Sequence, residues 1–174
     1  MSRNETFSKY GKSFQEGLVN LILNDRPFAD QITEVLDINF LELEYLRVFT
    51  SKIVNYRKKY SKHPSCETVI TMLRTELDSE NEVVQTQVKD YFKRIHNKEV
   101  QDVEYIKEQS LDFCRKQTLK SAIIKSVDLL NKSSFDEIST IINKALLMGE
   151  SNDFGYDYVK DFEKRFEIKA RDQV

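Results

Sequence analysis

Apolar residues recur every three or four positions along most of the chain, and this spacing places them on one face of an α-helix. The pattern is interrupted at His63-Pro64, at Ser79-Glu80-Asn81 and at Asn131-Lys132-Ser133. It predicts an all-α fold in which a small globular helical bundle is followed by a long αα-hairpin and a detached C-terminal linker helix. The helices are expected over residues 13–24, 27–36, 41–60, 65–77, 83–95, 102–130 and 134–148.

Four signals predict where helices begin. Pro27 suits a first turn, where its missing N–H would be unpaired anyway. Ser65 and Asp102 are expected as N-caps, and Ser134 with Glu137 has the spacing of a capping box. Together with the turns, these signals divide the chain into a globular part over residues 1–98, a hairpin over 99–148, a linker over 149–155 and a linker helix over 156–174.

The long helix over residues 102–130 contains no Gly or Pro, and its second half is apolar on two nearly opposite sides. Ile124 and Val127 lie on one side, and Leu119, Ile123 and Leu130 lie on the other. The partner helix adds Phe135, Ile138 and Ile142. A surface helix of a monomer needs only one such face, so the second face is expected to pack either on the body of the same domain or on a partner subunit.

A short helix is expected after the linker, with an aromatic stripe. Tyr158, Val159, Phe162 and Phe166 share one side, and charged residues cover the other. A helix of about a dozen residues is marginal alone in water, so we expect this stripe to dock on another surface.

The composition, the net charge and the cysteine count limit the classes of fold and function to which the chain can belong. The 174 residues include only 4 Gly and 2 Pro, which disfavours a many-stranded β fold, and the formal net charge of −2 gives no global attraction for nucleic acid. The 2 cysteines cannot form a multi-bridge framework, and no apolar segment follows the polar start, so a cytoplasmic protein is expected. No apolar run is long enough to cross a membrane.

The sequence offers no catalytic, cofactor-binding or metal constellation. Neither Gly149 nor Gly155 belongs to a phosphate-binding loop, because no Lys-Ser/Thr follows them. The one zinc combination that composition permits is His63, Cys66, His96 and Cys114, whose spacing matches no compact ligand pattern. Surface histidines and buried cysteines are the simpler interpretation.

Charge is nonetheless uneven along the chain. Six acids and one base lie between Asp25 and Glu44, whereas six bases and no acid lie between Tyr45 and His63. Arg57, Lys58 and Lys59 with the tyrosines beside them form a candidate nucleic-acid patch. The simpler interpretation is a solvated helix end whose lysines favour the C-terminal dipole, with the aromatic rings in the core stripe.

Three stretches resemble the N-terminal collar domain and linker helix of replicative hexameric helicases of the DnaB type, especially those of tailed phages. The first is Gln15–Asp25, where an acid precedes paired aliphatic residues and a closing Asn-Asp. The second is Asp37-Ile38-Asn39-Phe40 with the long helix and the Pro64-led helix behind it. The third is the hairpin from Asp102 to Met148 with the helix that ends near Phe166.

The resemblance implies a phage-encoded protein of the bacterial cytosol that forms dimers of hairpins, arranged as a trimer in a ring, and receives primase and the helicase loader. It also implies that an ATP- and Mg²⁺-dependent motor domain, which moves 5′ to 3′ on single-stranded DNA, should follow the linker. This domain is missing from the 174 residues, so the chain is expected to be a fragment without a catalytic site of its own. The alternative is a self-contained helical adaptor with no enzymatic parent, which binds nucleic acid through Arg57, Lys58 and Lys59.

Overall fold

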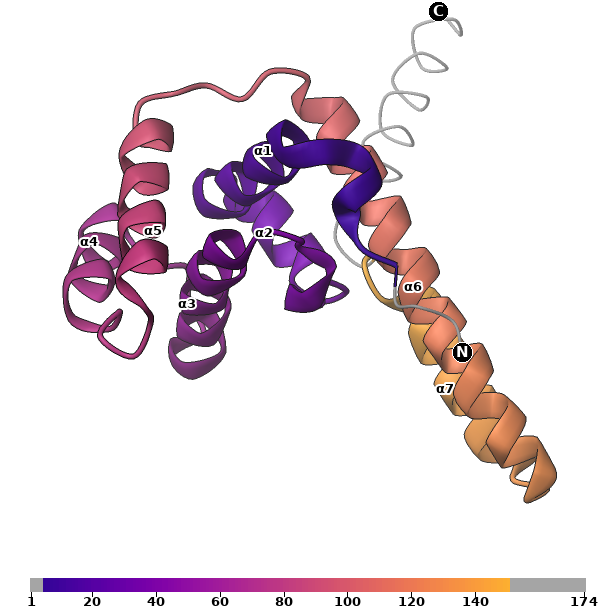
Figure 1. Ribbon diagram of the computed structural model, residues 1–174. Helices are drawn as coiled ribbons and strands as arrows, with labels where there is room; N and C mark the ends of the chain where they lie inside the picture. Colours follow the sequence, from indigo (N-terminus) through magenta and orange to yellow (C-terminus); the bar gives the residue numbers. More distant parts are fainter. Residues whose placement is uncertain (1–4, 151–174) are drawn as a thin grey trace, which may run out of the picture. The chain divides into compact units, whose positions relative to one another are not determined.

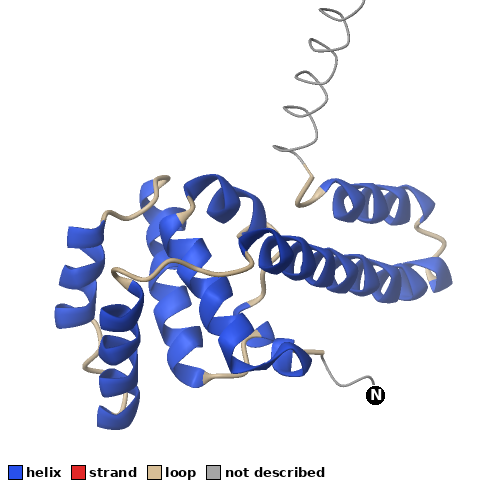
Figure 2. Ribbon diagram, turned by 90° about the horizontal axis from the view of Figure 1, so that it is seen from above, coloured by secondary structure: helices blue, strands red, loops and turns tan. Residues whose placement is uncertain are grey.

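The computed structural model describes residues 5–150, which form seven α-helices and two 3₁₀ turns without any strand (Figure 2). The all-α prediction is confirmed. The elements are η1 (Phe7–Tyr10), α1 (Gly11–Asn24), α2 (Arg26–Ile32), η2 (Ile38–Phe40), α3 (Glu44–Tyr60), α4 (Cys66–Thr75), α5 (Glu82–Ile95), α6 (Val103–Asn131) and α7 (Phe135–Leu147).

The chain divides into two compact units, and the division falls between Cys114 and Arg115, inside α6. The first unit therefore contains η1 to α5 and the first part of α6. The second unit contains the rest of α6 and α7. The first unit is here called the globular unit, and the second the hairpin unit.

The core of the globular unit is built around α1 and α3. Helix α1 packs on η1, α2 and α3, and α3 packs on α5. The side chains of Leu18, Ile22, Phe49 and Ile53 are buried to 1% exposure or less. Burying a side chain of this size stabilises the fold by roughly 1.5–3 kcal/mol, so these helices are held by their shared apolar faces.

An aromatic cluster attaches the start of the chain to α6 within the globular unit. The ring of Phe7 lies 4.5 Å from that of Phe113 and 6.0 Å from that of Phe14, centroid to centroid. The ring of Phe40 from η2 meets Phe113 edge-on at 5.4 Å. The pattern of spacings did not predict η1 or η2, because a single 3₁₀ turn is too short to show a helical period.

Helix α1 approaches the first part of α6 closely at Gly17. A Cβ atom at this position would lie 2.9 Å from Cδ1 of Ile106 and 3.5 Å from Cγ1 of Val100. A Cβ at this distance touches the movable end of the Ile106 side chain, and a side chain larger than that of alanine would have to displace Ile106 and Val100. This close packing favours a small residue in the middle of α1, although glycine there costs about 1 kcal/mol relative to alanine.

The predicted helix starts are partly right. Pro27 lies in the first turn of α2, which Asp25 caps, and the Ser65 hydroxyl accepts a hydrogen bond from the Thr68 N–H at 3.2 Å. The capping box was wrong, because Ser134 directly precedes α7 but its side chain makes no capping hydrogen bond. Asp102 precedes α6 with a φ of 55°, the left-handed region rather than the extended backbone of an ordinary N-cap.

The hairpin unit consists of two helices that lie side by side and run in opposite directions (Figure 1). The turn between them is short and has Ser133 in the left-handed region, with a φ of 56°. Ala122 of α6 and Ala145 of α7 are buried, and Arg115 forms an ion pair with Glu150 at the base of the hairpin. Small residues at buried positions allow two helices to pack closely.

Candidate interaction surfaces

The hairpin unit exposes large apolar side chains along both of its helices. Seven of them keep about half or more of their surface in contact with solvent. They are Ile123 (51%), Ile124 (53%), Val127 (56%), Leu130 (56%), Phe135 (63%), Leu146 (47%) and Leu147 (66%). Monomeric proteins rarely expose so many large apolar residues together, so the group is a candidate interaction surface.

These residues lie on one side of the hairpin. On α6, Ile123, Val127 and Leu130 are spaced i, i+4 and i+7, a single helical stripe; on α7, Phe135 and Leu146 are eleven residues, about three turns, apart. On both helices the exposed stripe lies about one residue's rotation, in the same direction, from the buried alanine, which is Ala122 on α6 and Ala145 on α7. Because the two helices are right-handed and run antiparallel, this rotation brings both stripes to the same side of the hairpin. This side is here called the hairpin face, and Ile124 and Leu147 lie at its edges.

The interface residues expected from the sequence fall into two groups. Ile123, Leu130 and Phe135 belong to the hairpin face and are exposed. Leu119, Ile138 and Ile142 are half-buried, in keeping with positions at or near the contact between α6 and α7. The sequence analysis placed Ile124 and Val127 opposite Ile123, whereas Val127 follows Ile123 by four residues and extends the same stripe.

The globular unit contains a cavity of about 490 Å³ between α1, the end of α5 and the start of α6. Its wall combines the aromatic rings of Tyr10, Phe14 and Tyr105 with the ion pair of Glu16 and Arg94. The size suits a small ligand. The sequence analysis missed this cavity, because its residues come from segments about 80 positions apart, as the 78-residue separation of the Arg94 to Glu16 hydrogen bond shows.

Glu16 is the centre of a polar network beside this cavity. Both terminal nitrogens of Arg94 donate to its carboxylate at 2.9 Å, and the Tyr45 hydroxyl donates to Oε1 at 2.5 Å. Burial alone would raise the pKa of Glu16, but the hydrogen bonds from Arg94 and Tyr45 outweigh it, so the pKa lies below its usual value. Burial and the neighbouring carboxylate raise the pKa of Tyr45.

The network leaves the cavity without a clear ligand preference. The charge of Arg94 is already matched by Glu16, and the remaining charged residues of the lining are Lys98, Glu99 and Asp102. Charges of both signs select neither an anion nor a cation. The hydrogen bonds explain the cluster as a structural tie between α1, α3 and α5.

Arg57, the first residue of the candidate nucleic-acid patch, is committed to the fold. It forms an ion pair with Asp30, and its Nη1 donates to Nδ1 of His63 at 2.8 Å. The other ring nitrogen of His63, Nε2, lies 2.6 Å from the carbonyl oxygen of Leu23 and donates to it. These bonds link the last turn of α3 and the segment that follows it to α1 and α2.

His63 is therefore held in its neutral form. Burial lowers the pKa of His63, and the nearby charge of Arg57 adds to that effect. A proton on Nδ1 would point at the Arg57 guanidinium, which donates there. The expectation that His63 is a surface histidine is thus wrong: it is partly buried and doubly hydrogen-bonded.

Lys58 and Lys59 remain at the surface, and Lys62 joins them. No described carboxylate between residues 5 and 150 forms an ion pair with any of the three. Tyr60 is 52% exposed, so its ring is not fully placed in the core stripe as the simpler interpretation expected. The Tyr60 ring lies 4.6 Å from that of Tyr56, and Nζ of Lys59 is 5.3 Å from its centroid.

The residues of the zinc combination do not form one cluster. Sγ of Cys66 lies 3.5 Å from Nδ1 of His96 at the surface, while Cys114 is fully buried and the ring nitrogens of His63 are occupied. Within residues 5–150, no group of three or more candidate ligands is close enough to hold a metal ion. The expectation that both cysteines are buried holds for Cys114 and is wrong for Cys66.

The linker-helix residues Tyr158, Val159, Phe162 and Phe166 lie outside the described residues. Of the helices within residues 5–150, none combines the length and the apolar character that a membrane crossing requires.

Comparison with known proteins adds no family to this description. No family model, no curated protein and no solved structure matches the chain.

Proposed function

We propose that the chain is the N-terminal collar domain of a replicative DNA helicase of the DnaB type, where it mediates ring assembly and provides the docking surface for primase or the helicase loader. The observation that carries this proposal is the hairpin face. It is a two-helix apolar surface with no cover among the described residues of its own unit.

A second copy of the same hairpin is the simplest cover for this surface. Two such faces related by a two-fold axis form an isologous contact, in which each subunit presents the same residues to the other. Four helices then enclose one apolar core, as in a four-helix bundle. The stripes extend over about two turns on α6, from Ile123 to Leu130, and about three turns on α7, from Phe135 to Leu146.

The resemblance described for the sequence supplies the rest of the proposal. It places such hairpins in the collar of a hexameric ring, ahead of an ATP- and Mg²⁺-dependent motor that unwinds duplex DNA. It also makes primase and the loader the partners of the collar. On this proposal the stripe of Tyr158, Phe162 and Phe166 docks on a neighbouring subunit's motor.

The test is the assembly state of two charge variants. Ile123→Asp places a carboxylate in the middle of the hairpin face and is expected to dissociate the collar without unfolding it. Ser121→Asp adds the same charge at an exposed position of α6 outside the stripe and is expected to leave assembly unchanged. Analytical ultracentrifugation and circular dichroism separate dissociation from unfolding, and an Ile123→Asp protein that still assembles would refute the proposal.

A second experiment decides between the collar and the self-contained adaptor. The exposed Lys58 and Lys59 favour the adaptor, although Arg57 is already paired. Sequencing the gene beyond codon 174 separates the two. A frame that continues into a strand and the motif G-x-x-x-x-G-K-S/T supports the collar, and a stop codon at that point supports the adaptor. If the motor follows, Phe162→Ala is expected to weaken assembly only in its presence.

A further inference from the structure

The last turn of α3 and the residues after it form an exposed turn that is held at both ends, here called the basic turn (Lys58–Lys62). Arg57, just before it, is paired with Asp30 of α2. His63, just after it, donates to the Leu23 carbonyl of α1 and accepts from Arg57. The turn is therefore presented on a fixed base, which lowers the entropy lost when it binds a partner.

The basic turn presents charge and an aromatic ring together. Lys58, Lys59 and Lys62 are exposed, and none forms an ion pair with a carboxylate within the described residues. The neighbouring Tyr60 lies seven residues after Ile53, on the stripe that is fully buried further back in α3, yet it is 52% exposed. At this end of α3 the apolar stripe therefore extends past the helices that bury it further back, and the Tyr60 ring is left at the surface.

We infer that the basic turn binds single-stranded nucleic acid, with the lysines at phosphates and Tyr60 against a base. Lysine ammonium groups attract the phosphate backbone, and an exposed ring offers the flat contact that unpaired bases use. An acidic peptide would match the lysines but not the ring. The Ser61 backbone, with a φ of 54°, lies in the left-handed region and ends α3, so that Lys62 follows the helix on the exposed turn.

Arg57 has a different role from the one the sequence suggested. Its guanidinium is occupied by Asp30 and His63, so it positions the turn and does not contact the ligand. The inference therefore replaces Arg57 by Tyr60 and Lys62 in the binding surface. It does not depend on the collar proposal, because the surface belongs to the globular unit and the proposed assembly uses the hairpin unit.

The experiment is fluorescence anisotropy of a labelled oligothymidylate of about 20 nucleotides with the whole 174-residue chain. Binding in the range of about 10–100 μM is expected near physiological salt, and it should strengthen as the salt is lowered. The variant Lys58→Gln/Lys59→Gln/Lys62→Gln is expected to bind at least about tenfold more weakly and to lower the salt slope by about 2.

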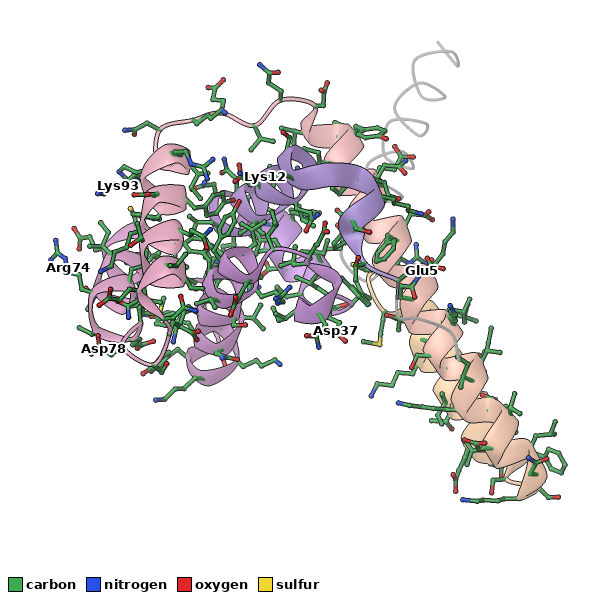
Figure 3. All side chains as sticks on the ribbon, viewed as in Figure 1. Glu5, Lys12, Asp37, Arg74, Asp78 and Lys93 are labelled. Atoms are coloured by element: carbon green, nitrogen blue, oxygen red, sulfur yellow. The ribbon has the colours of Figure 1, made fainter. Side chains whose placement is uncertain are left out.

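A matched variant controls for net charge. Lys89→Gln/Lys93→Gln/Lys98→Gln removes three exposed lysines from α5 and the segment after it, and Figure 3 shows Lys93 on the outside of the bundle. It is expected to leave binding nearly unchanged. Tyr60→Ser should weaken binding roughly 5- to 100-fold without changing the salt slope, whereas Tyr60→Phe should bind like the unaltered chain.

Three results would overturn the inference. The first is that the unaltered chain does not bind the oligonucleotide at about 50 mM salt, or binds it with an affinity that does not change with the salt concentration. The second is that the control lysine variant loses as much affinity as the basic-turn variant. The third is that a polyglutamate peptide of equal charge displaces the oligonucleotide as well as unlabelled oligonucleotide does, which would identify a docking surface for acidic protein segments.

Discussion

The two units use the same kinds of residue in opposite ways. In the globular unit Phe7, Leu18 and Ile53 are completely buried, whereas in the hairpin unit Phe135, Ile123 and Leu146 are 63%, 51% and 47% exposed. Helices α1 to α5 and the first part of α6 surround the first core, so most of its large apolar side chains meet another helix. Two helices alone can cover only one stripe on each other, and the second stripe stays open.

The polar groups differ in the same way. The globular unit ties its helices together with partly buried hydrogen bonds, such as Tyr91 to the Glu16 carbonyl at 2.5 Å and Asn20 to the Lys98 carbonyl at 3.3 Å. Such bonds hold one arrangement of helices in place. In the hairpin unit the described ion pair is the one between Arg115 and Glu150 at its base. The comparison thus sets a unit whose large apolar side chains are mostly buried against a unit whose described helices leave seven large apolar side chains exposed.

The largest predicted effect separates a buried ring from an exposed one. Phe7→Ala removes a side chain that contacts four other rings and should lower the free energy of unfolding by about 3–5 kcal/mol. Phe135→Ala should cost less than about 1 kcal/mol at low protein concentration. Thermal unfolding at two concentrations checks both, and a growing Phe135→Ala deficit at high concentration would show that this ring is covered in an assembly.

A second prediction concerns the close approach of α1 to α6 at Gly17. Gly17→Leu should destabilise the globular unit by about 1–3 kcal/mol, because the added atoms have to displace Ile106 and Val100. Gly17→Ala should be nearly neutral, since the gain in helix propensity offsets a contact with the movable end of Ile106. Chemical denaturation measures both, and a Leu variant as stable as the unaltered protein would contradict the packing described here.

The third prediction follows from the neutral state of His63. Because the folded pKa lies below the ordinary value of 6.5, the unfolded chain binds more protons, and stability is lost as the pH falls below about 6.5. The loss should not exceed about 1.4 kcal/mol per pH unit for this one group. Urea unfolding measured between pH 7 and pH 5 should show that the free energy of unfolding falls less steeply with decreasing pH for His63→Gln than for the unaltered chain.

The smallest effect is expected at Thr50. Its hydroxyl is buried and has no hydrogen-bond partner in the described structure, so Thr50→Val should stabilise the globular unit by about 1 kcal/mol. The control is Thr33→Val, because the Thr33 hydroxyl donates to the Ala29 carbonyl at 2.6 Å. Thr33→Val should lower the free energy of unfolding slightly. Equal effects of the two variants in thermal unfolding would show that the Thr50 hydroxyl is not an unsatisfied buried group.

Much of the helical order could be predicted from the sequence, because it depends on spacing along one helix. The expected helices around Leu18, Ile53, Val69 and Val88 are all present, since a helical face is a local property. Helix ends were less predictable: Ser65 caps α4, but Ser134 makes no capping bond in front of α7. A cap depends on backbone angles that the neighbouring turn sets.

The candidate surfaces depended on the tertiary structure. The sequence indicated that Ile123 and Leu130 need a surface to pack on, but only the pairing of α6 with α7 showed that Phe135 and Leu146 share their side. Likewise, the spacing along the chain made Arg57 and Lys58 equal candidates for contacts with nucleic acid. In the fold their roles differ, because Arg57 pairs with Asp30 and His63, whereas Lys58 remains at the surface.

By itself, the sequence determined the all-α class and the position of the helices, because apolar periodicity and the rarity of Gly and Pro act along the chain. The tertiary structure decided which apolar stripes are covered, which charges are paired and where a cavity forms. Those outcomes depend on residues far apart in the chain, such as Glu16 and Arg94, meeting in space. Burial and pairing are properties of neighbours in space, and periodicity reports only neighbours along a helix.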